Sequence, residues 1–361
     1  MTQIPRGART TVTATGPAAP AHHAPVDVVT LGESMVTFVP SVPGRLADVP
    51  SFDRGIGGAE SNVACVLAAA GHTVRWVSRV GADGFGDHLV DAIGAYGVDT
   101  SAVRRDPARP TGIYFRTAGD RATDAHEVAY YRAGSAASAM TSQNMDLAAI
   151  RSGRVLHLSG ITPALSAGCL DLTADLTART PAGRPLVSFD VNHRPGLWPR
   201  PDDARVLLDL ARGADLVFVG EDEAEDAWGI TGGPDAIRAA LPEPATLVVK
   251  RGADGAVAYD EHGVRHTEPA PRVDVVAAVG AGDAFAAGYL SGALRGLPVP
   301  ARLRHGHLMA AAALTTSGDL AAPPSRAHAD RLADLDDASW GTLHLGPGWT
   351  ADGAVEEVRT P

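Results

Sequence analysis

The sequence has little cysteine, no excess of basic residues and no long apolar run, and each shortage argues against a class of protein. Its 361 residues include two cysteines, Cys65 and Cys169, far apart in apolar segments, so a disulfide framework or a thiolate metal site is not expected. Lysine and arginine total 31 against 42 acidic residues, a net charge of -11, which argues against binding nucleic acid or an anionic membrane. No stretch approaches the roughly 20 apolar residues that cross a bilayer.

The first 26 residues have no apolar period that a folded core could bury. They contain four prolines, Pro5, Pro17, Pro20 and Pro25, and no acidic residue. A secretory signal needs a continuous apolar stretch and a transit peptide needs an arginine-rich amphipathic helix, and the segment has neither. We therefore expect residues 1–26 to form a flexible tail and the protein to be cytoplasmic.

Beyond Asp27, short apolar runs alternate with longer periodic segments, and the content of 45% hydrophobic and 20% charged residues is typical of a globular protein. Strand-like runs occupy residues 27–33, 73–81, 154–160, 184–190, 215–220 and 245–250, and helix-length segments occupy 59–71, 166–179 and 201–213. Nearly continuous apolar strands separated by helices predict a parallel sheet covered on both faces. The predicted fold class is therefore α/β.

Three segments break this rhythm. Residues 34–55, 111–118 and 127–134 look like strands of alternating polarity, the last two joined by a polar loop. They predict a small antiparallel sheet beside the main one.

The strongest chemical signal is AAVGAGDAFAAGYLSGAL, residues 277–294. Gly280, Ala281 and Gly282 open a helix of small and apolar residues, so backbone N–H groups at its positive end can approach an anion closely. Asp283 follows at once. Its carboxylate could cap the first turn of the helix or accept a proton from a bound hydroxyl group, and the spacing favours neither.

Two further glycine-rich turns suit a small ligand. KRGADGA, residues 250–256, has Gly252 and Gly255 in a tight turn after a strand, which fits a phosphate loop or an ordinary hairpin. GIGGAESN, residues 55–62, lets the backbone at Gly57 and Gly58 lie against a ligand. Neither turn matches the dinucleotide pattern G-x-G-x-x-G or the P-loop pattern G-x-x-x-x-G-K-[ST], so a nicotinamide dehydrogenase or a P-loop enzyme finds no support.

Six segments follow one another along the chain: GGAESNVACVLAAAG, VSRVGADGFGDHL, HLSGITPAL, FDVNHRPGLW, VVKRGADGAVAY and VGAGDAFAAGYL. In this order they resemble the ribokinase-like (PfkB-type) carbohydrate kinases, over about residues 27–325. TGIYFRT, YYRAGSAAS, SGITPAL and DVNHRPGLW look most like 2-keto-3-deoxygluconate kinases. The resemblance implies a three-layer ribokinase-like sandwich with a mostly parallel central sheet and a small antiparallel β lid from about residues 34–55 and 110–134.

The resemblance also implies roles for individual residues. Asp283 would be the catalytic base, taking the proton from the sugar hydroxyl as it attacks the γ-phosphate of ATP. The backbone of Gly280, Ala281 and Gly282 would form an anion hole, and Mg2+ would bridge the ATP phosphates. The residues implied at ATP are Asn192, Arg194, Lys250, Gly252, Gly255, Gly280 and Gly282, and those implied at the sugar are Gly58, Tyr114, Tyr130, Arg132, Arg194, Asp283 and Asp319.

Arg132 and Arg194 carry the substrate assignment. Two guanidinium groups suit a carboxylate, whereas a neutral hexose needs no such charge. Taken singly, Arg132 could be a solvated strand residue and Arg194 a surface residue at the start of a helix, but together in their motifs they favour a sugar-acid ligand. The implied reaction is phosphorylation of 2-dehydro-3-deoxy-D-gluconate to its 6-phosphate.

Three positions depart from the family pattern. The metal-associated motif N-x-x-E begins here with Gly220 and keeps only Glu223, which would act on Mg2+ through water. Ala277 stands where many relatives have an aspartate that helps to hold a monovalent cation, which argues against activation by potassium. His193 replaces the usual tyrosine of D-x-N-Y-R and could introduce pH sensitivity.

The predicted organisation is a tail over residues 1–26, a kinase domain over 27–335 and a C-terminal extension over 336–361. We expect ATP and a sugar or sugar acid as partners, no nucleic acid or membrane, and a homo-oligomer formed through edge strands of the lid. Three alternatives stay open: a fructokinase or another sugar kinase of the superfamily, a nucleoside kinase, and a sugar or nucleotide sensor without activity, against which Asp283 argues.

Overall fold

The computed structural model describes residues 23–117, 127–179, 183–198, 203–318 and 320–351. The first strand, β1, spans Val26–Leu31. Most of the segment expected to be a flexible tail, residues 1–22, therefore lies outside the described residues. Within the described part, no helix is long and apolar enough to cross a membrane.

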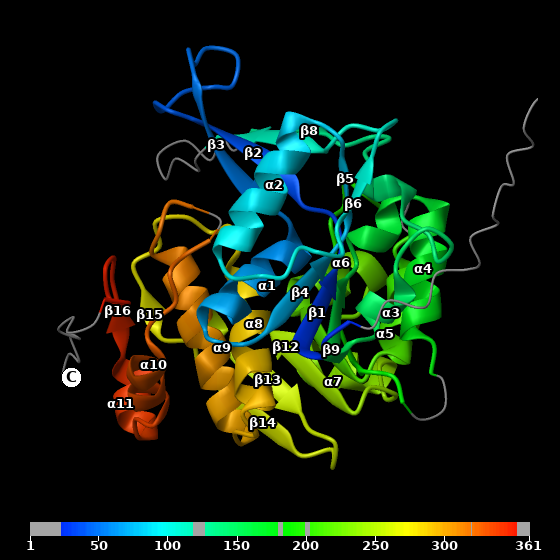
Figure 1. Cartoon of the computed structure of the whole chain (residues 1–361). Coiled ribbons are helices and arrows are strands. Elements are labelled where there is room, and N and C mark those ends of the chain that lie inside the picture. The colour runs from blue at the N-terminus through cyan, green and yellow to red at the C-terminus, as the bar shows by residue number, and fades with distance from the viewer. Residues whose placement is uncertain (1–22, 118–126, 180–182, 199–202, 319, 352–361) are drawn as a thin grey trace, which may run out of the picture.

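The central sheet contains eight strands in the order β14-β13-β12-β11-β10-β9-β1-β4 (Figure 1). Its parallel strands are β1, β4 (Val74–Val77), β9 (Gly153–Ser159), β10 (Leu186–Asp190), β11 (Leu216–Gly220) and β12 (Thr246–Lys250). At one edge β13 (Ala256–Tyr259) and β14 (Arg265–Glu268) continue the sheet with antiparallel pairing. The predicted mostly parallel α/β sheet is therefore confirmed.

The strand predicted over residues 73–81 is wrong in its second half. β4 ends at Val77, and β5 (Arg79–Gly81) pairs instead with β6 (Arg104–Asp106) in a separate two-stranded sheet. The guanidinium of Arg79 lies 2.7 Å from the carboxylate of Asp106 and ties the two short strands together. The pattern of apolar residues does not show that the chain leaves one sheet and pairs in another.

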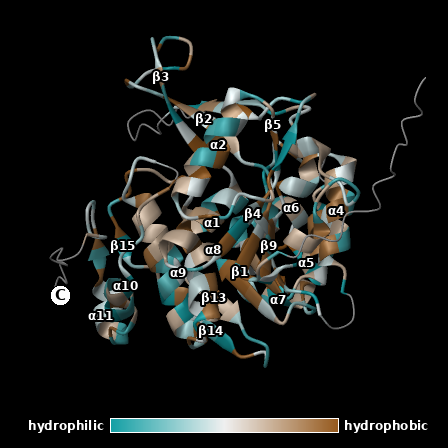
Figure 2. Cartoon of the chain, viewed as in Figure 1, coloured by the Kyte–Doolittle hydropathy of each residue, from teal (hydrophilic) through white to brown (hydrophobic). Residues whose placement is uncertain are grey.

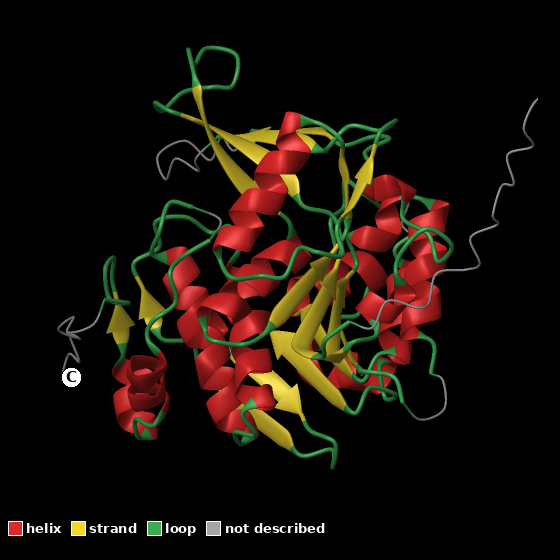
Figure 3. Ribbon diagram, in the orientation of Figure 1, coloured by secondary structure: helices red, strands yellow, loops and turns green. Residues whose placement is uncertain are grey.

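Helices cover both faces of the central sheet (Figure 3), and the strands β1 and β9 between them are largely brown in Figure 2. Successive strand residues face opposite layers: in β12, Leu247 and Val249 join one buried cluster and Val248 joins the other. The first layer contains α3 (Leu147–Ile150), α4 (Ala167–Thr177), α5 (Arg205–Gly213), α6 (Glu221–Trp228) and α7 (Gly233–Ala240). The second contains α1 (Ala59–Ala69), α8 (Ala281–Leu294) and α9 (Val299–Leu314).

A four-stranded sheet in the order β3-β2-β7-β8 lies at the top of Figure 1. Its strands are β2 (Met35–Pro40), β3 (Phe52–Gly57), β7 (Ile113–Arg116) and β8 (Val128–Tyr131). The pairs β2–β3 and β7–β8 are antiparallel as predicted, whereas β2 and β7, which are joined by a long connection containing α1 and α2 (Gly84–Ala95), pair in parallel. The edges of this sheet are β3 and β8, and their pairing with another copy of the chain stays a prediction.

The C-terminal segment packs beside α9. It forms α10 (Arg326–Ala333), α11 (Asp337–Thr342) and β16 (His344–Leu345), which pairs with β15 (Arg272–Val273). The guanidinium of Arg304 in α9 lies 5.0 Å from the centre of the Trp340 ring and also pairs with Glu268 and Asp337. The predicted boundary at residue 336 between domain and extension stays a prediction.

Helices α8 and α9 approach closely because each presents a glycine to the other. A Cβ atom on Gly288 of α8 would lie 2.3 Å from the backbone oxygen of His305 in α9. One on Gly306 of α9 would lie 2.9 Å from the ring of Phe285 in α8. Since a backbone oxygen cannot rotate away as a side chain can, the packing of α8 depends on Gly288.

Gly288→Ala is therefore expected to lower the free energy of unfolding by about 1–3 kcal/mol through overpacking. Gly94→Ala in α2 is the matched control, because its Cβ would lie 3.9 Å from its nearest neighbour, Thr100. That variant is expected to gain up to about 1 kcal/mol from helix propensity. Chemical denaturation of both variants measures the difference, and equal stabilities would contradict the packing argument.

Candidate active site

The predicted anion-binding residues Gly280, Ala281 and Gly282, called the anion turn from here on, form the N-terminus of α8. Gly280 precedes the helix with φ of 77°, a left-handed conformation that favours glycine, and Ala281 is the first helical residue. The N–H groups of the first turn have no partner within the helix, so they lie at the positive end of a 14-residue helix dipole. The predicted start of this helix is confirmed.

Asp283 does not occupy the N-cap position, which belongs to Gly280. Its Oδ2 accepts a hydrogen bond of 2.9 Å from the Asn62 side chain in α1, and its Oδ1 lies 3.5 Å from the Asn192 amide nitrogen after β10. Asn192 has φ of 42° and is the one non-glycine residue with positive φ in the described part, a conformation that asparagine tolerates better than most residues. The carboxylate is thus held by side-chain amides that come from two other parts of the chain.

The pKa of Asp283 is raised to about 6, mainly by burial and also by the carboxylate of Asp190, while the hydrogen bond from Asn62 opposes the rise. The carboxylate is thus largely ionised at neutral pH but binds a proton more readily than an exposed aspartate. A group with this pKa in a partly enclosed site is suited to accept a proton.

Lys250, the single lysine of the chain, lies at the end of β12. Its Nζ donates to both carboxylate oxygens of Asp190 at 3.0 Å. Burial lowers the pKa of Lys250, but the charges of Asp190 and Glu223 outweigh burial, so the net shift is upward and the amine stays charged. A Cβ on Gly282 would lie 3.6 Å from Nζ, which places this cation beside the anion turn.

Glu223 lies in the first turn of α6, close to the same cation. Its Oε2 accepts a hydrogen bond of 2.6 Å from the backbone N–H of Gly220, and its Oε1 lies 3.7 Å from Arg194. Burial raises the pKa of Glu223 more than Lys250 lowers it. No cluster of three or more side chains able to hold a metal ion occurs among the described residues.

The turn at residues 251–255 joins β12 to β13, which pair antiparallel with Lys250 opposite Ala256. The hairpin considered from the sequence is therefore present, and its role at a nucleotide stays a prediction. Gly252 and Gly255 both have positive φ, and a Cβ on Gly255 would meet the backbone oxygen of Glu268 at 2.2 Å. Only glycine fits at position 255, where both the positive φ and this contact exclude a side chain.

The smaller sheet directs its predicted site residues to one face. Tyr114 of β7 is opposite Tyr130 of β8, with ring centres 5.3 Å apart, and the Arg132 guanidinium lies 5.8 Å from the Tyr130 ring centre. Tyr114 is buried, whereas Tyr130 is 55% exposed. Gly58, which precedes α1, leaves no room for a side chain, because a Cβ would lie 2.4 Å from the backbone oxygen of Glu33.

The two predicted arginines have different surroundings. The Arg132 side chain is 12% exposed and pairs with the buried carboxylate of Glu33, which also accepts a hydrogen bond from Ser135. It is therefore not a solvated strand residue. The Arg194 side chain is 53% exposed, donates to the backbone oxygen of His193 at 2.8 Å and lies near Glu223.

Two predicted residues remain, His193 and Asp319. His193 is buried, and burial lowers its pKa, so the ring is neutral at pH 7. Asp319, predicted to contact the sugar, lies outside the described residues.

Four residues with contacts at the site were not predicted from the sequence. Asn62 and Glu60 lie in the GIGGAESN turn, Asp190 precedes Asn192 by two residues in FDVNHR, and Glu33 follows the first strand. Their contacts with Asp283, Lys250 and Arg132 join distant parts of the chain. For Asn62, Glu60 and Asp190 the only sequence signal was their place within the motifs, and Glu33 lies outside the motifs.

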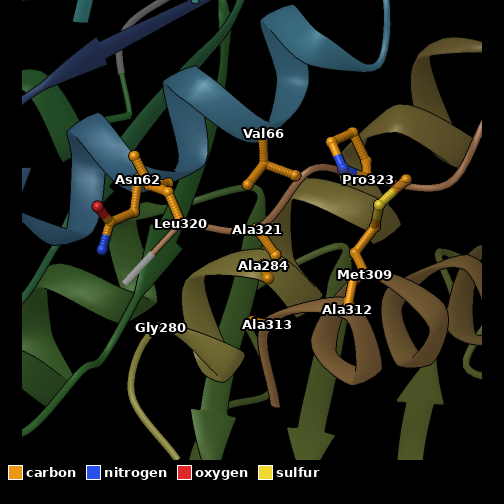
Figure 4. A pocket seen from close by; sticks show the side chains of 10 residues that line it. All are labelled: Asn62, Val66, Gly280, Ala284, Met309, Ala312, Ala313, Leu320, Ala321 and Pro323. Carbon is orange, nitrogen blue, oxygen red and sulfur yellow. The ribbon is translucent and has the colours of Figure 1, made fainter. Parts of the chain in front are cut away.

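A small hollow lies behind the anion turn (Figure 4). Asn62 and Gly280 line it together with Val66 of α1, Ala284 of α8 and Met309 of α9, and segment 320–323 closes one side. Its volume is about 10 Å³, enough for one water molecule at most. α1, α8 and α9 therefore meet tightly around the N-terminus of α8.

Comparisons with known proteins agree with this architecture. The family model described as pfkB family carbohydrate kinase matches residues 26–326. The chain is 36% identical to a 2-dehydro-3-deoxygluconokinase of Bacillus subtilis (strain 168), covering 90% of this chain and 99% of that protein. It is 34% identical to fructokinase-1 of Zea mays, covering 73% of this chain and 81% of that protein.

Among solved structures, 2-dehydro-3-deoxygluconokinase from Thermotoga maritima superposes with a TM-score of 0.76 at 27% identity. The match covers 87% of this chain and 100% of that one. The family resemblance inferred from the motifs is confirmed. The chain belongs to the pfkB family of carbohydrate kinases.

Proposed function

We propose that this sugar kinase phosphorylates 2-dehydro-3-deoxy-D-gluconate to its 6-phosphate with ATP and Mg2+, with Asp283 as the base. The observation that carries the proposal is the position of Asp283: it is partly buried, directly follows the anion turn, and is held by the side-chain amides of Asn62 in α1 and Asn192 after β10. The Bacillus subtilis and Thermotoga maritima relatives carry the name of this activity.

In the proposed reaction Asp283 removes the proton of the acceptor hydroxyl as that oxygen attacks the γ-phosphorus. The bond from phosphorus to the β,γ-bridging oxygen breaks, and ADP leaves. Asn62 occupies Oδ2 with its hydrogen bond, so Oδ1, which has only the longer contact with Asn192, is the better placed oxygen to accept the proton. Fixing the carboxylate in advance reduces the reorganisation needed for proton transfer.

The anion turn and Lys250 supply positive potential for the transferred phosphoryl group. The N–H groups of Gly282 and its neighbours offer hydrogen bonds at the helix N-terminus. An ammonium group has three N–H donors, of which Lys250 uses two on Asp190. The third is free to meet a phosphate oxygen.

The donor chemistry of the site fits Mg2+ bound mainly through ATP. Asp190 and Glu223 offer carboxylate oxygens, the hard ligands that Mg2+ prefers, and Glu223 would hold the ion through water. When bound, Mg2+ neutralises phosphate charge. Many relatives have an aspartate at the position of Ala277, and its absence here argues against activation by potassium.

The side chains at the smaller sheet and at Arg194 favour a sugar acid as the substrate. Tyr114 and Tyr130 provide an aromatic wall, and Arg132 and Arg194 provide the cations that a substrate carboxylate would meet. The lid would close over the sugar and exclude water.

A fructokinase is the second candidate, and one observation favours it. Both predicted cations already have carboxylate partners: Arg132 pairs with the buried Glu33, and Arg194 lies 3.7 Å from Glu223. A pocket with this balance of charge would also tolerate a neutral ketohexose.

A substrate panel separates the candidates. ADP release with 2-dehydro-3-deoxy-D-gluconate, fructose, ribose and adenosine is expected to give the highest kcat/KM for the sugar acid. A higher value for fructose would establish the second candidate. Tight binding of one compound without ADP release would identify a sensor instead of an enzyme.

Arg132→Ala and Arg194→Ala are expected to raise the KM for the sugar acid about tenfold or more and the KM for ATP by less, because each removes a charged hydrogen-bond donor. Since Arg132→Ala leaves Glu33 buried without its partner, Arg132→Lys is measured beside it. Arg265→Ala, at an arginine 47% exposed, is the control. An unchanged sugar KM in both alanine variants would reject the assignment.

Asp283→Asn is expected to lower kcat by about 100-fold to 10,000-fold, the usual range for loss of a general base. In the native protein kcat/KM should fall as pH drops below about 6, because protonation of Asp283 removes the acceptor. Rates from pH 5 to 8 measure this limb, with Asp209→Asn as the control at a carboxylate 75% exposed. Near-native turnover in Asp283→Asn would contradict the role of the base.

A further inference from the structure

Glu60 is a fully buried carboxyl group next to the site, with no role so far. It lies in the first turn of α1 with no exposed surface. Its Oε1 accepts hydrogen bonds of 2.8 Å from Ser159 at the end of β9 and 2.9 Å from Thr162 just beyond. Its Oε2 is buried without a hydrogen-bond partner in the described structure.

The carboxyl group of Glu60 is packed between the residue after β1, the end of β9 and the turn that follows β9. A Cβ on Gly32, just after β1, would lie 2.1 Å from the carboxyl carbon of Glu60, so glycine at 32 makes the space that Glu60 fills. The hydroxyls of Ser159 and Thr162 hold the other side. Glu60 therefore links the start of α1 to the ends of β1 and β9.

This link bears directly on Asp283. Asn62, two residues after Glu60 in the same turn, donates the 2.9 Å hydrogen bond to Asp283. A displacement of this turn would move the Asn62 amide with it. Because hydrogen bonds weaken steeply with poor geometry, the orientation of the base depends on the anchorage of the turn.

Charge explains why the anchor should be neutral. An ionised carboxylate with an unpaired oxygen in the core is costly, and a second negative charge near Asp283 would make ionisation of the base harder. The pKa of Glu60 is raised to about 7, mainly by burial and to a smaller extent by the charge of Asp283, while the hydrogen bonds from Ser159 and Thr162 oppose the rise.

Other titratable groups on the elements around α1 have partners of their own. Those partnerships are Asp27 with Thr73 and Arg154, Glu33 with Arg132, Arg75 with Asp99, and His157 with Ser188. The charged group whose field raises the pKa of Glu60 is Asp283 on α8.

We propose that Glu60 is a positioning residue: its buried carboxyl group anchors the first turn of α1 and so holds Asn62 on Asp283, and in its protonated form it adds no charge beside the base. The proposal rests on the proposed function only through the role of Asp283. The protonation of Glu60 is tested by the stability of the protein without substrate, and its positioning role is tested by turnover.

The thermodynamic test compares melting temperatures of native protein and Glu60→Gln from pH 5 to pH 8. A carboxyl whose pKa is higher in the folded protein than its ordinary 4.5 contributes stability that is full below pH 4.5 and is lost as pH rises through about 7. Glutamine has no such dependence. The Tm of the variant relative to native should therefore rise by about 3–5 °C across this range.

Glu261→Gln is the matched control, because the Glu261 side chain is 73% exposed and carries no buried charge. Its Tm should stay parallel to that of native protein at every pH. If the Tm of Glu60→Gln also stays parallel to that of native protein at every pH, the claim that Glu60 is protonated in the folded protein is wrong, whatever the substrate panel gives.

The kinetic test uses the sugar with the highest turnover in the panel. Glu60→Gln keeps an oxygen for Ser159 and Thr162, whereas Glu60→Ala leaves both hydroxyls without an acceptor. We expect kcat to fall more than tenfold in the alanine variant and less than about threefold in the glutamine variant, with KM for ATP within twofold of native in both.

Equal losses of kcat in the two variants, or native kcat in Glu60→Ala, would overturn the positioning role. If Glu60→Ala does not fold, the pair Ser159→Ala and Thr162→Val removes the same hydrogen bonds from the other side and is expected to lower kcat in the same way. Native kcat in that double variant would equally overturn the proposal.

Discussion

The hydrogen bond between Asn62 and Asp283 joins two helices whose residues here are 221 positions apart in sequence. The site is built around it, since α1 contributes Gly58 and Glu60 on one side and α8 contributes the anion turn on the other. Its length is maintained by packing and not by the bond alone: the close approach of α8 to α9 at Gly288 and Gly306 leaves α8 little freedom to shift. Geometry at the base is thus set by contacts far from it.

Charge is the second constraint. The chain carries a net charge of -11, and its single lysine is placed among Asp190, Glu223 and Asp283. A site with this many carboxylates would repel ATP unless they were neutralised. Lys250 compensates Asp190, Arg194 lies 3.7 Å from Glu223, and the dipole of α8 adds positive potential. These effects together make an acidic protein compatible with an anionic nucleotide.

Sequence reasoning succeeded where the signal is local. Apolar runs predicted the strands of the central sheet, and the glycines of the anion turn predicted the start of α8. It failed where partners are distant. The departure of β5 to pair with β6 depends on Arg79 and Asp106, and the pairs of Asn62 with Asp283 and Lys250 with Asp190 cross from one element to another. A periodic pattern carries no information about which polar side chains will meet.

The pairing of Arg132 with Glu33 has a consequence for the proposed binding of a sugar acid. Glu33 follows β1 of the central sheet, whereas Arg132 follows β8 of the four-stranded sheet, so this buried ion pair connects the two sheets. A substrate carboxylate that reaches Arg132 must share the guanidinium with Glu33, and its five N–H donors allow this. A neutral sugar leaves the pair unchanged. Because the second carboxylate would enter an already neutral pair, its binding energy must come from hydrogen-bond geometry and from Arg194 more than from net charge.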